Sequence, residues 1–304
     1  MLLSNRFRIL QKVPNVWRNV LPLGGLTVLT FHNLVANETE RQQTDPRYTH
    51  TIEEVEAILL YLLRAGFAFV SMEQVLGGLP THGRLALLTM DDGYAGNLAL
   101  LPILDRLGIP VTWFITTAPI ASGQPFWWDA FAAAHPEKTR SAQKAAIQHL
   151  AESGYPASAK NPSGQTTVPD FLRPLTPEEL RQACASGAVS IGFHGHTHTW
   201  FTRLNADQRR AECQASATLF HEWGLRPLPI LAFPDGAFNR DAVLQLQQDG
   251  FDAVFTTRAY TNPPTTHGIW GRFTLYGDEA ATQVHRIVHP SRVREAWIRR
   301  KSNI

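Results

Sequence analysis

Short apolar runs recur along this chain, and amphipathic segments separate them. The runs cover residues 26–31, 67–70, 85–90, 111–115, 189–193, 230–233 and 253–256. Their hydrophobicity is nearly continuous rather than alternating, which is typical of strands covered on both faces in a parallel sheet or barrel. The alternation of strands and helices over most of the chain therefore predicts a single α/β domain with a (β/α) barrel-like architecture.

Helix start signals stand between the predicted strands. Capping patterns begin predicted helices at Thr51, Thr176, Asn205 and Asn239. The helix after Asn205 is expected to carry Ala211, Ala215 and Leu219 on one apolar face.

We divide the chain into an N-terminal extension (1–25), a barrel (26–275) and a basic C-terminal helical segment (276–304). Residues 116–175 interrupt the rhythm of the barrel with an aromatic cluster, a helical stretch and a polar loop rich in Pro and Gly. An insertion beside the strand ends is expected to form a lid or substrate wall, with a surface excursion as the alternative.

Composition narrows the class of protein only slightly. The formal net charge of +2 does not indicate a nucleic-acid partner. Basic residues gather near both chain ends, where solvated helix faces are the favoured interpretation and contact with an anionic membrane surface is the unsupported alternative. The two cysteines make no disulfide framework, and no signal peptide or spanning segment stands out, so we expect a cytoplasmic protein.

Chemistry-bearing residues follow three of the predicted strands. Asp91 and Asp92 come after the run 85–90, His194 comes after 189–193, and His32 comes after 26–31. In α/β barrels the carboxyl ends of the strands carry the active site, so the fold should bring these residues together.

A metal site is the simplest use of these residues. Adjacent carboxylates raise each other's pKa unless a cation or a reaction uses them. His194 and His198 are four residues apart, so on one predicted helical turn they would point the same way and bind a cation together with Asp92. His196 would then point elsewhere.

Motifs at these positions resemble those of the polysaccharide deacetylases, the NodB homology domain of carbohydrate esterase family 4. Thr89-Met90-Asp91-Asp92-Gly93-Tyr94 resembles the family's TFDDG motif. His194-Gly195-His196-Thr197-His198-Thr199 resembles its HTxxHP motif, with Thr199 in place of proline, and residues 232–236 are similar to an FxYPYG stretch. The resemblance covers about residues 26–275. It implies a distorted (β/α)7 barrel that removes N-acetyl groups from an N-acetylated sugar of a polysaccharide or glycan precursor.

The resemblance also implies roles for individual residues. Asp92, His194 and His198 would hold a divalent metal, most often Zn²⁺, with Co²⁺, Mn²⁺ or Ni²⁺ as alternatives, and Asp91 would be the general base. Leu29-Thr30-Phe31-His32-Asn33 resembles a permuted branch of the family with a histidine motif on the first strand. This favours His32 as the general acid over the competing candidates His285 and His289.

Two departures from the family pattern leave alternatives open. The third motif lacks the arginine that pairs with the catalytic aspartate, and Arg272 is the candidate to replace it, with a surface position as the alternative. Asp235 stands where an aromatic residue is common, so Trp127 and Trp128 would either stack on a sugar or fill the core. We expect substrate contacts at Tyr94, Trp128, Phe233, Pro234 and Arg272.

Two other functions fit the same motifs. One is hydrolysis of another non-peptide C–N amide bond on this fold. The other is a catalytically decayed module that binds a metal or a glycan.

Overall fold

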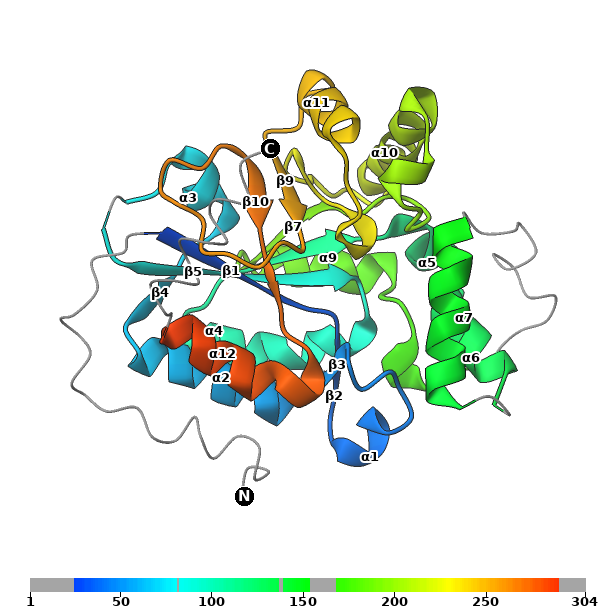
Figure 1. Ribbon diagram of the computed structural model, residues 1–304, viewed down its shortest axis with the longest axis horizontal. Coiled ribbons are helices and arrows are strands. Elements are labelled where there is room, and N and C mark those ends of the chain that lie inside the picture. Colours follow the sequence, from blue (N-terminus) through cyan, green and yellow to red (C-terminus); the bar gives the residue numbers. More distant parts are fainter. Residues whose placement is uncertain (1–24, 81, 137–138, 154–167, 290–304) are drawn as a thin grey trace.

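The computed structural model describes residues 25–80, 82–136, 139–153 and 168–289 (Figure 1). The predicted N-terminal extension, apart from Gly25, and the basic residues after 289 lie outside this range. No helix among the described residues is long and apolar enough to cross a membrane.

A sheet of parallel strands forms the centre of the molecule (Figure 1). Its strands run in the order β10-β9-β8-β7-β6-β5-β1-β11, and β4 pairs with the first three residues of β5. All seven predicted strands are present: β1 (Gly25–Phe31), β4 (Phe67–Phe69), β5 (Arg84–Asp92), β6 (Val111–Ile115), β7 (Val189–Phe193), β8 (Ile230–Ala232) and β9 (Ala253–Thr256). Most of their residues are buried, as their continuous hydrophobicity predicts.

The sheet curls into a nearly closed barrel through a strand that the apolar pattern did not reveal. β10 (Gly268–Gly271) pairs with β9 at one end of the strand order, and β11 (Phe273–Thr274) pairs with β1 at the other end. Arg272 alone separates β10 from β11, so the two edges of the sheet are joined by one short segment. Counting β10 and β11 as one strand, with β1 and β5 to β9, gives the predicted (β/α)7 barrel.

Helices cover the barrel where the capping signals place them. Thr51 and Glu54 form a reciprocal capping box at the start of α2 (Ile52–Arg64), and Thr176 and Glu179 form another at the start of α9 (Pro177–Ala185). The other helices are α1 (Glu38–Arg41), α3 (Met72–Gly77), α4 (Leu101–Leu107), α5 (Thr117–Ser122), α6 (Trp127–Ala134), α7 (Arg140–Ser153), α10 (Ala206–Glu222), α11 (Arg240–Gln248) and α12 (Ala280–Val288).

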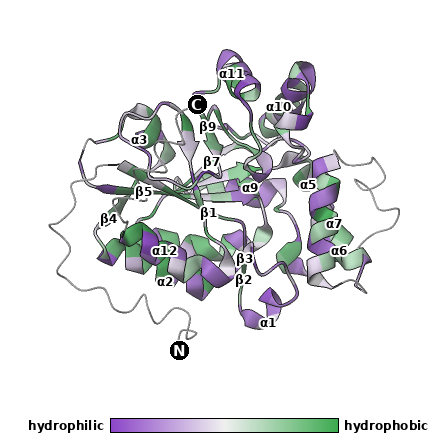
Figure 2. Ribbon diagram, in the orientation of Figure 1, coloured by the Kyte–Doolittle hydropathy of each residue, from purple (hydrophilic) through white to green (hydrophobic). Residues whose placement is uncertain are grey.

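α2 and α12 lie side by side along one face of the sheet, and both contain many hydrophobic residues (Figure 2). Most of the buried residues of both helices are apolar. Val284, Ile287 and Val288 of α12 join the same hydrophobic core as the barrel strands. The described part of the predicted C-terminal segment is therefore packed on the barrel.

The apolar face predicted for α10 is not the face that the structure buries. Arg209, Ser216 and Phe220 are the buried residues of this helix, whereas Ala211 is exposed and Ala215 and Leu219 are only half-buried. The buried positions include polar residues because they have partners: the Arg209 guanidinium donates to the Phe201 carbonyl and to Gln245 of α11. A search for apolar residues alone misses such a face.

The insertion contributes α5, α6 and α7, which lie together at one side of the barrel (Figure 1). Phe126 and Leu172 from this insertion form a small cluster with Tyr94, directly after the end of β5. The described part of the insertion is thus a wall beside the carboxyl ends of the strands. Two additional short strands, β2 (Asn33–Val35) and β3 (Thr49–Thr51), pair with each other near the end of β1.

Candidate metal centre and active site

Three strands, β1, β5 and β7, deliver the predicted site residues to one end of the barrel. In the register of the sheet, Met90 of β5 lies opposite Phe31 of β1, and Asp92 lies opposite Ile115 of β6, which in turn pairs with Phe193 of β7. His32 and His194 each come one residue after their strands end. The fold therefore places Asp92, His32 and His194 at the same level, as expected for strand ends of a parallel barrel.

Asp92, His194 and His198 converge on a single point. Among the residues described, these three form the one group of metal-ligating side chains whose ligand atoms lie within 4.8 Å of one another. Asp92 Oδ1 is 3.5 Å from Nε2 of His194 and 3.5 Å from Nε2 of His198. Ligands about 2.0–2.2 Å from a tetrahedral zinc ion are roughly 3.4 Å apart, so the spacing fits such an ion.

Hydrogen bonding around this group also fits a cation. The Ala232 carbonyl lies 2.8 Å from Nδ1 of His194, which fixes the proton there and leaves the Nε2 lone pair facing Asp92. Asp92 Oδ1 is buried and has no hydrogen-bond partner in the described part of the chain. A buried carboxylate oxygen without a donor is costly unless a cation binds it.

The pKa values of Asp92 and His194 also fit a bound cation. Burial, together with Asp91 and Asp235, raises the pKa of Asp92 well above its usual value, so these surroundings disfavour the carboxylate form. Burial lowers the pKa of His194 to about 3, which keeps the imidazole neutral, as a metal ligand must be. A divalent cation would supply the positive charge that Asp92 lacks.

The expectation that His194 and His198 share a helical turn is wrong. Residues after β7 form an irregular loop, in which Gly195 has φ +80° and His198 has φ +60°. These left-handed residues break the helical path, and the loop itself brings both Nε2 atoms to Asp92. His196 points away, as predicted, and its Nδ1 lies 3.0 Å from the Thr117 hydroxyl.

Asp91 faces a different partner from its neighbour. Both guanidinium Nη atoms of Arg272 donate to Asp91, at 2.7 Å and 2.8 Å. Burial alone would raise the pKa of Asp91, but Arg272 outweighs this and lowers the pKa to about 2. The surroundings of these adjacent aspartates thus favour the ionised form of Asp91 and the protonated form of Asp92.

Arg272 is neither at the surface nor available to a substrate. Its side chain is 1% exposed, and it occupies the junction between β10 and β11 that closes the barrel. The expected substrate contact at Arg272 is therefore wrong, and its place as the arginine partner of Asp91 is filled from a strand outside the third motif.

His32 lies at the site, and the two competing histidines do not. The His32 ring packs against Tyr48 with centroids 5.0 Å apart, and its Nδ1 has no hydrogen-bond partner among the described residues. Burial lowers the pKa of His32 to about 4, with the Asp91 charge opposing this shift. His285 and His289 lie near Arg84, at the start of β5, whereas Asp91 is seven residues further along, about 23 Å for an extended strand.

Trp128 and Tyr94 form a wall beside the histidines. The Trp128 ring lies 4.7 Å from the His198 ring, and its indole N–H donates to the Tyr94 hydroxyl at 2.6 Å. The Tyr94 hydroxyl donates to Asp129 at 2.6 Å. Trp128 is half-buried, so part of its side chain remains exposed, while Phe126 stacks on it from within the insertion.

The third motif supplies no apolar substrate surface of its own. Phe233 is fully buried and packs against Phe201 and Phe238, and Pro234 is buried as well, so the substrate contacts expected at Phe233 and Pro234 are wrong. Asp235 instead accepts a hydrogen bond from the Trp200 indole N–H at 2.6 Å. Sequence reasoning missed Trp200, which directly follows the histidine motif, and Tyr48, which lies in a loop that carries no motif.

Comparison with known proteins agrees with this architecture. Residues 78–254 match the family described as polysaccharide deacetylase, and this span includes Asp91, Asp92, His194 and His198 but neither His32 nor Arg272. More than half of the chain is matched, and the chain belongs to the polysaccharide deacetylase family. No curated protein matches the chain.

Several solved structures share the fold. IcaB from Ammonifex degensii is 20% identical with a TM-score of 0.61, and the alignment covers 86% of this chain and 97% of IcaB. The Streptococcus pyogenes deacetylase PplD, in complex with acetate, is 15% identical with a TM-score of 0.61 over 89% of this chain and 100% of PplD. A de-N-acetylase from Aggregatibacter actinomycetemcomitans is 17% identical with a TM-score of 0.59 over 83% of this chain and 95% of that protein.

Proposed function

We propose that the protein is a metal-dependent hydrolase that removes N-acetyl groups from an N-acetylated sugar of a polysaccharide or glycan precursor. The observation that carries this proposal is the pairing of a buried Asp92–His194–His198 group with a separate carboxylate, Asp91, held beside it by Arg272. The names of similar structures, a deacetylase with acetate and a de-N-acetylase, support the choice of an acetyl group on nitrogen.

Asp92, His194 and His198 would hold the metal, with Zn²⁺ as the favoured ion because two imidazoles and one carboxylate leave a position open. A divalent ion bound there polarises the amide carbonyl and lowers the pKa of water at the site. Asp92 and the histidines then serve as ligands only, which leaves proton transfer to other side chains.

Asp91 is the proposed general base. Arg272 keeps Asp91 ionised, so its carboxylate is available to accept a proton near neutral pH, and the two hydrogen bonds fix its orientation. Such a strongly stabilised carboxylate is a weak base, so positioning rather than basicity is the main contribution of Asp91.

His32 is the proposed general acid. With a pKa of about 4 it is neutral at pH 7, so it must gain a proton during turnover before a ring nitrogen can donate to the departing amine. The Asp91 charge is the influence that favours this protonation most. Trp128, half-buried beside His198, is the proposed contact for the sugar ring.

Acetate release from a panel of N-acetylated glycans and nucleotide-linked or lipid-linked sugars tests the proposal. Asp91→Asn is the key variant, and Asp105→Asn, an exposed aspartate on α4, is the matched control. Release by the wild type and Asp105→Asn, but not by Asp91→Asn, is the expected result. No release from any substrate by protein that holds one metal ion per chain would favour another amide substrate or a binding role.

A further inference from the structure

The loop that carries two of the proposed metal ligands needs support from outside itself. His198 has φ +60°, a conformation that residues with a side chain rarely adopt, and Gly195 has φ +80°. The residues between β7 and the next 3₁₀ turn form no helix or strand that would hold this conformation. Strained residues persist only where their surroundings determine them.

One carboxylate on α10 supplies this support. Oε2 of Glu212 accepts hydrogen bonds from the backbone N–H groups of His196 at 2.7 Å and Thr197 at 2.8 Å. Oε1 of Glu212 accepts a third bond from the Thr197 hydroxyl at 2.7 Å. The two residues bound in this way lie between His194 and His198, so Glu212 holds the centre of the loop.

The carbonyl side of the same loop is held by α5. Ala118 N–H donates to the His196 carbonyl at 2.9 Å, and the Thr117 hydroxyl lies 3.0 Å from His196 Nδ1 and 3.1 Å from the Ser216 hydroxyl of α10. α5 and α10 contact each other beside this loop (Figure 1). The loop is therefore clamped from two helices, and His196 serves as an anchor rather than as a ligand.

We infer that Glu212 is a positioning residue of the metal centre, which rests on the proposed metal site. Its bonds to His196 and Thr197 fix the loop so that Nε2 of His198 reaches Asp92 Oδ1. Hydrogen bonds donated to a carboxylate are stronger and shorter than those between neutral groups, and their loss frees the ligand that they orient.

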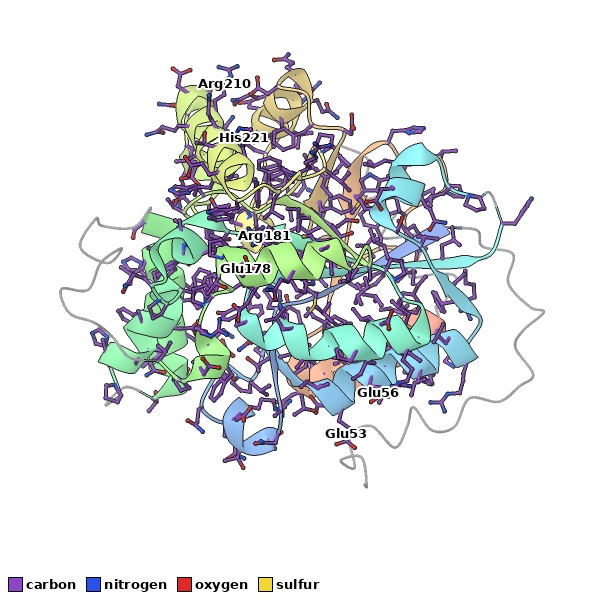
Figure 3. All side chains as sticks on the ribbon, turned by 180° about the vertical axis from the view of Figure 1, so that it is seen from behind. Glu53, Glu56, Glu178, Arg181, Arg210 and His221 are labelled. Atoms are coloured by element: carbon purple, nitrogen blue, oxygen red, sulfur yellow. The ribbon has the colours of Figure 1, made fainter. Side chains whose placement is uncertain are left out.

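Glu212→Gln tests this role because it keeps the size of the side chain but replaces one accepting oxygen with an NH₂ donor. Glu222→Gln is the matched control, because Glu222 is the last residue of the same helix and is exposed. Figure 3 labels two other exposed residues of this helix, Arg210 and His221. Thr197→Val is the milder variant, which removes the hydroxyl bond to Glu212 and the contact with the Thr199 hydroxyl but keeps the backbone bond to Glu212. The readout is Zn²⁺ affinity of metal-free protein, measured by competition with a chromophoric chelator, with far-UV circular dichroism as the check of folding.

We expect Glu212→Gln to bind Zn²⁺ about 10–100-fold more weakly than the wild type, Thr197→Val a few-fold more weakly, and Glu222→Gln equally well. Unchanged affinity in both Glu212→Gln and Thr197→Val would overturn the role of Glu212, and Thr197→Val alone decides if Glu212→Gln does not fold. Failure of the wild type itself to bind Zn²⁺ would instead overturn the proposed metal site.

Discussion

Two pairs of histidines in this chain have the same spacing and opposite surroundings. His194 and His198 lie in a loop at the carboxyl end of the barrel with ring centroids 4.9 Å apart, and His285 and His289 lie on or next to α12 at the other end with centroids 4.6 Å apart. In both pairs the rings are close enough to share an ion. Only the pair in the loop meets a carboxylate among the described residues, namely Asp92.

The pair at α12 has cationic and neutral neighbours instead. The His285 ring nitrogen Nδ1 lies 3.2 Å from the Tyr61 hydroxyl, and burial, together with His285 and Arg84, lowers the pKa of His289. Its surroundings therefore oppose a bound cation. A four-residue spacing at a helix therefore does not by itself assemble a metal-ligating group, which also needs a carboxylate such as Asp92.

The largest expected effect distinguishes the two histidine pairs directly. His194→Ala removes a ligand from a three-residue group, so Co²⁺ binding should weaken by at least about 10³-fold, beyond the ~10–100-fold typical of an outer partner, and turnover should vanish. His289→Ala should leave both unchanged. Visible absorption of the Co²⁺-loaded proteins measures binding, and equal losses in the two variants would refute the assignment.

Asp91→Asn should reduce turnover by about 10²–10⁴-fold, the usual contribution of a general base, while metal affinity stays near the wild-type value. The reason is that Asp91 contacts Arg272 and does not belong to the metal-ligating group. Paired measurement of kcat and Zn²⁺ affinity checks this prediction. A variant that loses its metal would place Asp91 among the ligands instead.

Arg272→Met should lower the free energy of unfolding by about 3–5 kcal/mol, because it leaves the buried Asp91 carboxylate without its partner. Urea denaturation measures the change, with the exposed Arg226→Met as control. A loss below about 1 kcal/mol would mean that Asp91 finds another partner when Arg272 is absent.

His285→Ala should lower stability by about 0.5–1.5 kcal/mol, through the lost contact with Tyr61, and should not change acetate release. Thermal unfolding and the acetate assay test the two parts of this prediction. A fall in turnover without a fall in stability would connect α12 to catalysis.

The smallest effect concerns an arginine–carboxylate pair outside the barrel end. The Arg173 guanidinium lowers the pKa of Glu179 to about 2. The pair therefore stabilises the fold fully above about pH 4.5 and loses its contribution as the pH falls towards 2, by about 1 kcal/mol or less for a half-buried pair that solvent screens. Unfolding free energies of wild type and Glu179→Gln should converge in acid, and a constant difference across this range would contradict the pairing.

The sequence allowed the strands and the residues at their ends to be predicted because both depend on local patterns. Continuous apolar runs identified β1 and β5 to β9, and the carboxylates and imidazoles directly after them became the site. The closing strand was missed because glycines at positions 268 and 271 interrupt its apolar pattern. The sequence also left open whether Arg272 is buried or lies at the surface, because its burial depends on this closing strand.

Residues that act through tertiary contacts could not be predicted from the sequence. Glu212 belongs to a helix whose predicted face was wrong, and its bonds to the histidine loop have no sequence signal. The helical turn predicted for His194 and His198 failed because Gly195 and His198 take left-handed conformations that the spacing alone does not reveal. Tyr48 packs on His32 from a loop that carries no motif, and Trp200, directly after the histidine motif, bonds to Asp235 through a tertiary contact.

The central claim of the proposed function is that amide hydrolysis at the carboxyl end of the barrel depends on a metal ion. The most direct test is acetate release by protein stripped with a chelator and then reloaded with one equivalent of Zn²⁺, measured in parallel for Asp92→Ala. We predict that stripping abolishes release, that Zn²⁺ restores it in the wild type, and that it does not restore it in Asp92→Ala. Undiminished acetate release from stripped protein, or from Asp92→Ala, would contradict metal-dependent hydrolysis at this site.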